Sequence, residues 1–236
     1  MSDWPLIPKP AELAEQRLIE AILDGSFPTN STLPPERELA IMLGVTRPTL
    51  REALQRLSRD GWLEIHHGKP TRVTDYFREG SLGILNTLAH HPHNLPASFV
   101  PDLLRFRIAL APTYAREAVQ NHPQKVSNLL ETLQFLDDEA ETFAKADVRL
   151  HAALTSLSDN CIFPLVYNGF VQLSRFMGIT YFSDSRARGR SRTFYADLWD
   201  AAKIPDADKA ELITREVMTD SLNYWLKIAS TRGSDV

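Results

Sequence analysis

The sequence predicts a mainly α-helical protein with an N-terminal winged helix-turn-helix and a C-terminal antiparallel bundle of seven helices. Three observations lead to this prediction. Apolar residues recur at helical spacing over most of the chain, two helices near residue 45 are joined by a very short turn, and two short alternating segments follow them. We expect three helices and a small β-hairpin in residues 1–74, a polar linker in residues 75–80, and the helical bundle in residues 81–236.

The composition is that of a globular protein whose N-terminal part is locally basic. Hydrophobic residues make up 43% of the 236 positions, and the formal net charge is −4. Between Arg37 and Arg78, however, eight Lys and Arg stand against five Asp and Glu, so this part is positively charged within an acidic chain. The distribution favours nucleic-acid binding by one end of the molecule.

The single cysteine and the lack of a long apolar run bear on where the protein works. Cys161 has no second cysteine to pair with, and we expect it to be a small core residue rather than a nucleophile. No apolar stretch approaches the roughly 18 residues of a membrane span. We therefore expect a cytoplasmic protein with no membrane partner.

The N-terminal helices are marked by start and stop residues. A helix over residues 11–23 precedes a second helix, which begins near Pro35 and ends at Gly44. Thr46 is suited to cap a third helix, which ends at Gly61. Because so few residues separate the second and third helices, the pair predicts a helix-turn-helix. Its third helix buries a stripe formed by Leu50, Ala53, Leu54 and Leu57.

The polar residues at the start of the third helix lie off this apolar stripe. Residues at this position of a helix-turn-helix meet the edges of DNA bases, and an arginine there can bind guanine through two hydrogen bonds. Each arginine taken alone is also consistent with a solvated surface charge. As a group they predict DNA contacts, from Arg37, Thr46, Arg47, Thr49 and Arg51.

A β-hairpin is predicted from residues 62–65 and 71–74, with residues 66–70 as the turn. In a winged helix such a turn touches the minor groove or a phosphate, so His67 and Lys69 are the expected contacts. The two adjacent histidines in the turn are a weak indication of a metal site, because neighbouring residues on a hairpin point to opposite faces.

The C-terminal bundle is of the kind that builds ligand sites in its interior. Arg107 lies among apolar neighbours, and a buried arginine needs an anion or a hydrogen-bond acceptor. Its partner is either a ligand or an Asp or Glu of the protein, and both alternatives stay open. Tyr181 and Trp225 are likewise either core aromatic residues or ligand contacts.

Asp147 and His151 are spaced i, i+4 and share one helix face, which makes them weak candidates for a metal site. Zinc normally takes at least three protein ligands, and no histidine follows His151 in the chain. We interpret the pair as the remnant of a metal site or as a structural hydrogen bond, and we expect no bound metal or other cofactor. The chain also lacks the motifs of hydrolases, metalloproteases and nucleotide-binding enzymes, so we do not expect an enzyme.

The N-terminal segment resembles the winged helix of the GntR superfamily. The residues that carry the resemblance are PERELAIMLGVTRPTLREALQRLSRDGWLEIHHGKPTRV, in which DGWL and HGKPT are most similar to regulators of fatty-acid metabolism. A thinner similarity continues through HHPHN, SDNCIFPLVYNG, TYFSD and DSLNYWLKI. The resemblance implies a homodimeric transcription factor that represses fatty-acid degradation genes, activates unsaturated fatty-acid synthesis, and leaves its palindromic DNA operator when long-chain acyl-CoA binds.

The resemblance also assigns roles to individual positions. At the DNA it implies the five residues of the second and third helices named above, together with His67 and Gly68 in the wing. In the helical domain it implies acyl-CoA contacts from Arg107, Tyr181, Arg215, Met218, Ser221 and Trp225.

This chain departs from the family pattern at two positions. Pro48 replaces a threonine, and proline has neither an N–H nor a hydroxyl to offer a phosphate. Met218 replaces a small residue, so its bulk narrows the cavity and leaves the preferred acyl chain open.

A related GntR branch supplies the alternative function. It holds a divalent ion with an aspartate and a histidine at the spacing of Asp147 and His151, plus two later histidines, and captures a small carboxylate. In this sequence Tyr195 and about Thr219 stand at the later positions. The alternative is therefore a regulator that senses a small carboxylate through a metal.

Overall fold

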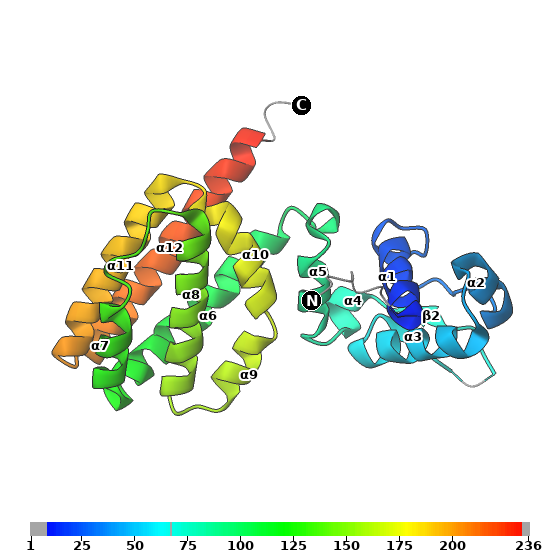
Figure 1. Cartoon of the computed structure of the whole chain (residues 1–236), viewed down its shortest axis with the longest axis horizontal. Coiled ribbons are helices and arrows are strands. Elements are labelled where there is room, and N and C mark those ends of the chain that lie inside the picture. Colours follow the sequence, from blue (N-terminus) through cyan, green and yellow to red (C-terminus); the bar gives the residue numbers. More distant parts are fainter. Residues whose placement is uncertain (1–8, 67, 233–236) are drawn as a thin grey trace, which may run out of the picture. The chain divides into compact units, whose positions relative to one another are not determined.

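The computed structural model describes residues 9–66 and 68–232, which fold into two compact units that divide at Leu88–Ala89 (Figure 1). Helices make up most of both units, and within the described part the one sheet is a two-stranded antiparallel ladder. The predicted fold class, mainly α-helical with a small hairpin in the N-terminal part, is confirmed.

The N-terminal unit is built from three helices followed by the hairpin. The first helix packs against the third, and the second meets the third across the short turn. In the hairpin Leu63 pairs with Val73, and Glu64 pairs with Arg72. The elements in order are α1 (Pro10–Leu23), α2 (Glu36–Leu43), α3 (Arg47–Asp60), β1 (Leu63–Glu64), β2 (Arg72–Val73), α4 (Tyr76–Glu79) and α5 (Ile84–Ala89), the last of which reaches the division between the units.

Local signals set the helix-turn-helix. Gly44 ends α2 in the left-handed conformation, with φ of 68°, which a residue without a Cβ adopts at little cost. The Thr46 hydroxyl accepts a hydrogen bond from the backbone N–H of Thr49 at 3.3 Å and so caps α3. The predicted cap is confirmed, and all four residues of the predicted apolar stripe are buried, namely Leu50, Ala53, Leu54 and Leu57.

Residues 75–80, predicted as a polar linker, instead contain α4 and lie within the N-terminal unit. Arg72 on β2 holds this helix: its Nη2 lies 2.6 Å from Glu79 Oε2 and 2.7 Å from Glu64 Oε2. The hydrogen bonds from Arg72 lower the pKa of Glu79 to about 2. Glu79 of this polar segment pairs with Arg72 of the hairpin. The polar composition of residues 75–80 therefore reflects an ion pair within the unit and not a flexible linker.

The end of α3 packs closely against the same segment. The Trp62 side chain is fully buried, and its ring centroid lies 4.7 Å from that of Tyr76. Gly61 has a φ of 92°, and a Cβ on it would lie 2.7 Å from the Cα of Gly80. Glycine is therefore required at residue 61 by backbone conformation and by the close approach of another backbone.

The C-terminal unit contains seven α-helices among its described residues, after a short 3₁₀ turn at Pro92–Asn94. The most extensive helix–helix contact joins α6 (Phe99–Asn121) to α12 (Ala207–Arg232). Helix α8 (Ala140–Leu157) packs against α10 (Val171–Phe182) (Figure 1). The helices are α6 (Phe99–Asn121), α7 (Pro123–Glu131), α8 (Ala140–Leu157), α9 (Ile162–Asn168), α10 (Val171–Phe182), α11 (Ser185–Lys203) and α12 (Ala207–Arg232).

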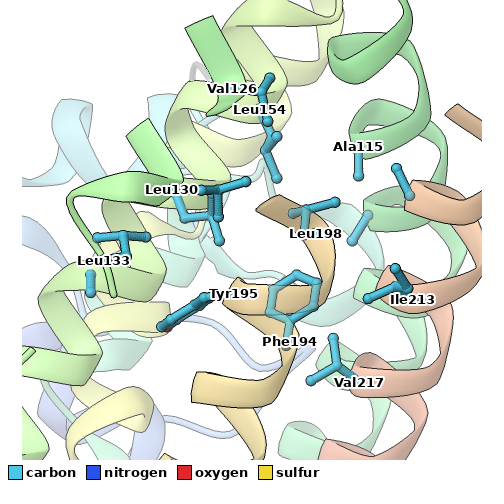
Figure 2. Close-up of a cluster of buried hydrophobic side chains, with 14 of the residues drawn as sticks. Ala115, Val126, Leu130, Leu133, Leu154, Phe194, Tyr195, Leu198, Ile213 and Val217 are labelled. Carbon is cyan, nitrogen blue, oxygen red and sulfur yellow. The ribbon is translucent and has the colours of Figure 1, made fainter. Parts of the chain in front are cut away.

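Aliphatic and aromatic side chains from α6, α7, α8, α11 and α12 converge in the core of this unit (Figure 2). Leu130, Leu154 and Leu198 are fully buried in it. Cys161, by contrast, is exposed just before α9, so the prediction that it is a core residue is wrong. None of the helices in the described ranges is both long enough and apolar enough to span a membrane.

We expect Gly61→Ala to destabilise the N-terminal unit by about 2–5 kcal/mol. The left-handed backbone costs an alanine about 1–2 kcal/mol, and displacing the Gly80 backbone adds the cost of overpacking, about 1–3 kcal/mol. Urea unfolding followed by tryptophan fluorescence measures the change.

Gly25→Ala is the matched control, because Gly25 has a similar φ of 82° but a Cβ on it would meet no atom within 4 Å. It should cost only the conformational part, about 1–2 kcal/mol. Equal losses in the two variants would show that the contact with Gly80 contributes nothing.

Candidate functional site

The start of α3 and the turn of the hairpin face a common groove of about 750 Å³. Arg47 and Arg51 line it from α3, and Gly68 and Lys69 line it from the turn. Ile65, Leu54 and Leu39 form apolar parts of its wall. The structure thus brings together four of the predicted DNA contacts, from two segments of the chain.

The cationic side chains of this surface are exposed and mostly unneutralised. Arg37, Arg47 and Lys69 make no ion pair with any residue of the described ranges. Arg51 Nε lies 2.8 Å from Glu36 Oε2, but the Arg51 side chain is 63% exposed, so the pair is weak. A surface with free guanidinium and ammonium groups attracts phosphate oxygens.

The remaining predicted DNA contacts differ in their surroundings. The hydroxyls of Thr46 and Thr49 lie 2.8 Å apart and serve the cap of α3, away from the groove lining. Arg37 is exposed on α2 and is not part of the groove lining either. Pro48 is exposed in the first turn of α3. His67 lies outside the described residues.

A second candidate site is a cavity of about 50 Å³ inside the C-terminal unit. Five of the six residues predicted to contact acyl-CoA line it: Arg107, Tyr181, Met218, Ser221 and Trp225. Most of the other lining is apolar, from Val100, Leu103, Leu104, Met177, Phe182, Phe194 and Val217. The sixth predicted residue, Arg215, is exposed on α12, where its Nη2 lies 2.9 Å from Glu211 Oε1, and it does not line the cavity.

A buried ion pair forms the polar part of this cavity. Arg107 Nη2 on α6 lies 3.2 Å from Asp147 Oδ2 on α8, and their side chains are 13% and 15% exposed. The sequence left a ligand and a protein carboxylate open as partners of Arg107, and in this structure the partner is the carboxylate. Both residues line the cavity, and Arg107 Nε is buried without a hydrogen-bond partner in the described part of the chain.

His151 and Tyr114 extend the polar network behind Asp147. His151 Nε2 lies 3.5 Å from Asp147 Oδ1, and the Tyr114 hydroxyl lies 2.7 Å from His151 Nδ1. Burial lowers the pKa of His151, which favours the neutral ring with Tyr114 donating to Nδ1. Burial opposes the charge on Asp147, but the guanidinium of Arg107 outweighs burial and holds the pKa of that carboxyl below its ordinary value.

This network is poorly suited to a metal ion. Asp147 and His151 are adjacent, as their spacing predicts, but no group of three His, Cys, Asp or Glu that could hold an ion occurs among residues 9–66 and 68–232. The guanidinium of Arg107 already occupies one oxygen of the carboxylate, and its positive charge repels a cation. The alternative of a metal-dependent sensor therefore has no third ligand in the part of the chain that the structure describes.

The cavity is too small for a long acyl chain without movement of its walls. Ligand pockets usually measure about 300–1,000 Å³, far more than the 50 Å³ observed. Two flexible methionines, Met177 and Met218, fill part of the interior. The Tyr181 hydroxyl lies 3.1 Å from Ser221 Oγ and so links α10 to α12 across the lining.

Six lining residues of α10 and α11 were not among the predicted contacts: Ser174, Met177, Gly178, Phe182, Ser191 and Phe194. The first two lie seven and four positions before Tyr181, so helical periodicity counted back from Tyr181 would have found them. The Ser174 hydroxyl is buried and has no hydrogen-bond partner in the described part. Nothing in the sequence marked Ser191.

Two family descriptions match consecutive parts of the chain. Residues 10–73 match the gntR family of bacterial regulatory proteins, and residues 74–236 match the FadR C-terminal domain. The fatty acid metabolism regulator proteins of Yersinia enterocolitica and Yersinia pestis are each 39% identical to this chain over 227 residues, which is 96% of this chain and 95% of each relative.

A solved structure of Listeria monocytogenes Lar, a protein described as controlling expression of the agr system, has a similar fold. It aligns with a TM-score of 0.66 and 16% identity over 94% of this chain and 98% of the Listeria chain. At this identity the likeness concerns the fold alone.

We expect Arg107→Met to destabilise the C-terminal unit by about 3–5 kcal/mol, because it leaves the Asp147 carboxylate buried without its cation. The double variant Arg107→Met/Asp147→Leu should recover most of that loss, since no unpaired charge then remains. Urea unfolding followed by far-ultraviolet circular dichroism gives the free energy of unfolding of each variant.

Arg105→Met on the same helix is the control, because Arg105 and its partner Asp102 are 57% and 61% exposed. It should change stability by less than about 1 kcal/mol. The single variant Asp147→Leu completes the comparison. If the double variant lost as much stability as Arg107→Met and Asp147→Leu added together, the two charges would not be coupled.

Proposed function

The chain belongs to the GntR family of bacterial regulatory proteins and carries the FadR C-terminal domain, and from this we propose a regulator of fatty-acid metabolism that long-chain acyl-CoA releases from DNA. It is a DNA-binding transcription regulator and not an enzyme. The observation that carries the proposal is that residues assigned to DNA line a cationic groove, whereas residues assigned to the acyl-CoA line a largely apolar cavity with a buried arginine.

We propose that the protein binds its operator as a homodimer, in the cytoplasm. Each protomer would place α3 in a major groove, and the two-fold symmetry of the dimer would require a palindromic site. Arg47 and Arg51 then contact base edges, and the hydroxyls of Thr46 and Thr49 contact the backbone. Arg37 and the wing residues His67, Gly68 and Lys69 complete the interface. Pro48 contributes no hydrogen bond, because it lacks an N–H.

The effector would bind in the cavity of the C-terminal unit. Its acyl chain needs more room than the present volume, so the side chains around Met218 and the Tyr181–Ser221 hydrogen bond must rearrange. The polar thioester end has a ready partner in the unsatisfied Nε of Arg107. We also retain Arg215, exposed on α12, as a proposed contact of the acyl-CoA.

Release follows if the enlarged bundle favours a dimer whose two wings no longer match the operator. The difference in acyl-CoA affinity between the two arrangements sets the size of the effect, and allosteric couplings are commonly about 1–3 kcal/mol. Under this proposal the protein represses genes of fatty-acid degradation and activates those of unsaturated fatty-acid synthesis, and acyl-CoA ends both effects.

Arg47→Ala should weaken operator binding by about 10-fold or more, because a bidentate arginine–guanine contact contributes about 1–3 kcal/mol. The operator is first selected from a randomised duplex library, and affinity is then measured by fluorescence anisotropy. Arg59→Ala removes the same charge from the last turn of α3, away from the groove lining, and should leave selectivity unchanged. Full operator selectivity in Arg47→Ala would contradict the assignment of α3.

Oleoyl-CoA at micromolar concentration should release the wild-type protein from the selected duplex. Met218→Ala, which enlarges the cavity, should lower the concentration required by several-fold. Leu212→Ala on the same helix is the control, because Leu212 is 56% exposed and outside the cavity lining. Unchanged anisotropy of the wild-type complex throughout the titration would rule out acyl-CoA as the effector.

A further inference from the structure

Helix α11 begins with arginines at four alternate positions, 186, 188, 190 and 192. Residues four apart share a helix face, so these arginines form two pairs that face different neighbours. Arg188 and Arg192 both bind Asp138, at 2.9 and 3.2 Å. Arg186 and Arg190 form the other pair: Arg186 binds Asp184 and lies over the Tyr224 ring of α12, and Arg190 binds Asp220 of α12.

The first pair contacts the segment before α8 and the end of α10, on the side of α11 away from α12. Arg188 binds both oxygens of Asp138, and its Nη1 also donates to the backbone carbonyls of Phe182 and Ser183. Hydrogen bonds from Arg188 and Arg192 lower the pKa of Asp138 to about 2. The guanidinium of Arg192 also lies over the Phe143 ring, 4.8 Å from its centroid.

The second pair lies beside the cavity. Arg190 Nε is 2.7 Å from Asp220 Oδ2 on α12. Ser191, next to Arg190, and Ser221, next to Asp220, both line the cavity. Arg190 is also close enough to the cavity residue Tyr181 to lower the pKa of its hydroxyl, although burial raises that pKa more. The Arg190–Asp220 pair therefore bridges α11 and α12 at the edge of the cavity.

Arg190 has spare hydrogen-bonding capacity. Its Nε is bonded to Asp220, but its terminal nitrogens Nη1 and Nη2 have no partner within the described ranges. Its side chain is 28% exposed, so these nitrogens are accessible from solvent, and the neighbouring residue Ser191 lines the cavity. Arg186, in contrast, uses both Nε and Nη2 on Asp184. Asp220 is 52% exposed and is free to turn outward.

We propose that Arg190 binds the phosphate groups of the coenzyme A portion of the effector, and that Asp220 holds this arginine in place until the ligand binds; the inference rests on the function proposed above. The planar guanidinium matches phosphate oxygens and binds them through two parallel hydrogen bonds. Asp220 competes for the same group and repels the phosphates, so its charge weakens ligand binding.

Titration of the full-length protein with two ligands tests the phosphate contact. Oleoyl-CoA carries phosphates, whereas S-oleoyl pantetheine has the same thioester and acyl chain without them. Tryptophan fluorescence reports binding. Arg190→Gln should weaken oleoyl-CoA binding by about 10-fold or more and leave S-oleoyl pantetheine binding within about twofold of wild type. Arg192→Gln, on the opposite face of α11, should behave as wild type with both ligands.

Asp220→Asn should act in the opposite direction and strengthen oleoyl-CoA binding several-fold, a gain that a damaged fold would not produce. Equal losses for both ligands in Arg190→Gln, or weaker oleoyl-CoA binding in Asp220→Asn, would overturn the assignment of Arg190. Failure of the wild-type protein to bind oleoyl-CoA at all would instead overturn the proposed function.

Discussion

The mutual need of Arg107 and Asp147 for each other is the physical constraint around which the polar part of the C-terminal unit is arranged. It joins α6 to α8 inside a bundle whose surroundings are almost entirely apolar, and each charge is stable there because the other is present. The same two residues line the cavity. The groups that stabilise the ligand-free bundle are therefore the groups that a polar ligand would have to engage, which couples binding to rearrangement of the helices.

The small volume of the cavity also indicates that ligand binding requires the helices to rearrange. A space of about 50 Å³ among methionine, leucine and aromatic side chains is a packed interior rather than a preformed pocket. Entry of an acyl chain separates side chains that now touch, and α12 contributes four residues to the lining, Val217, Met218, Ser221 and Trp225. A long helix that contacts both α6 and α11 is well suited to transmit such a displacement.

The N-terminal unit differs, because its structure is determined mostly by interactions between residues that are close in the chain. A glycine in the left-handed conformation, a threonine cap and an apolar stripe determine the helix-turn-helix within a few turns of chain. The arginines that face outward do so because the stripe faces inward. The segment after the hairpin is the exception, since Arg72 and Trp62 draw it into the unit through an ion pair and an aromatic contact.

The sequence by itself determined the helices, the turn and the hairpin, because caps and periodicity depend on neighbours within about one helical turn. It also predicted four residues that line the groove and five that line the cavity. It did not determine the partner of Arg107, which is 40 residues away, nor the attachment of residues 75–80, the exposure of Cys161 or the spare capacity of Arg190. These features arise only when helices distant in the chain pack together, because desolvation and charge pairing depend on what each side chain meets in space.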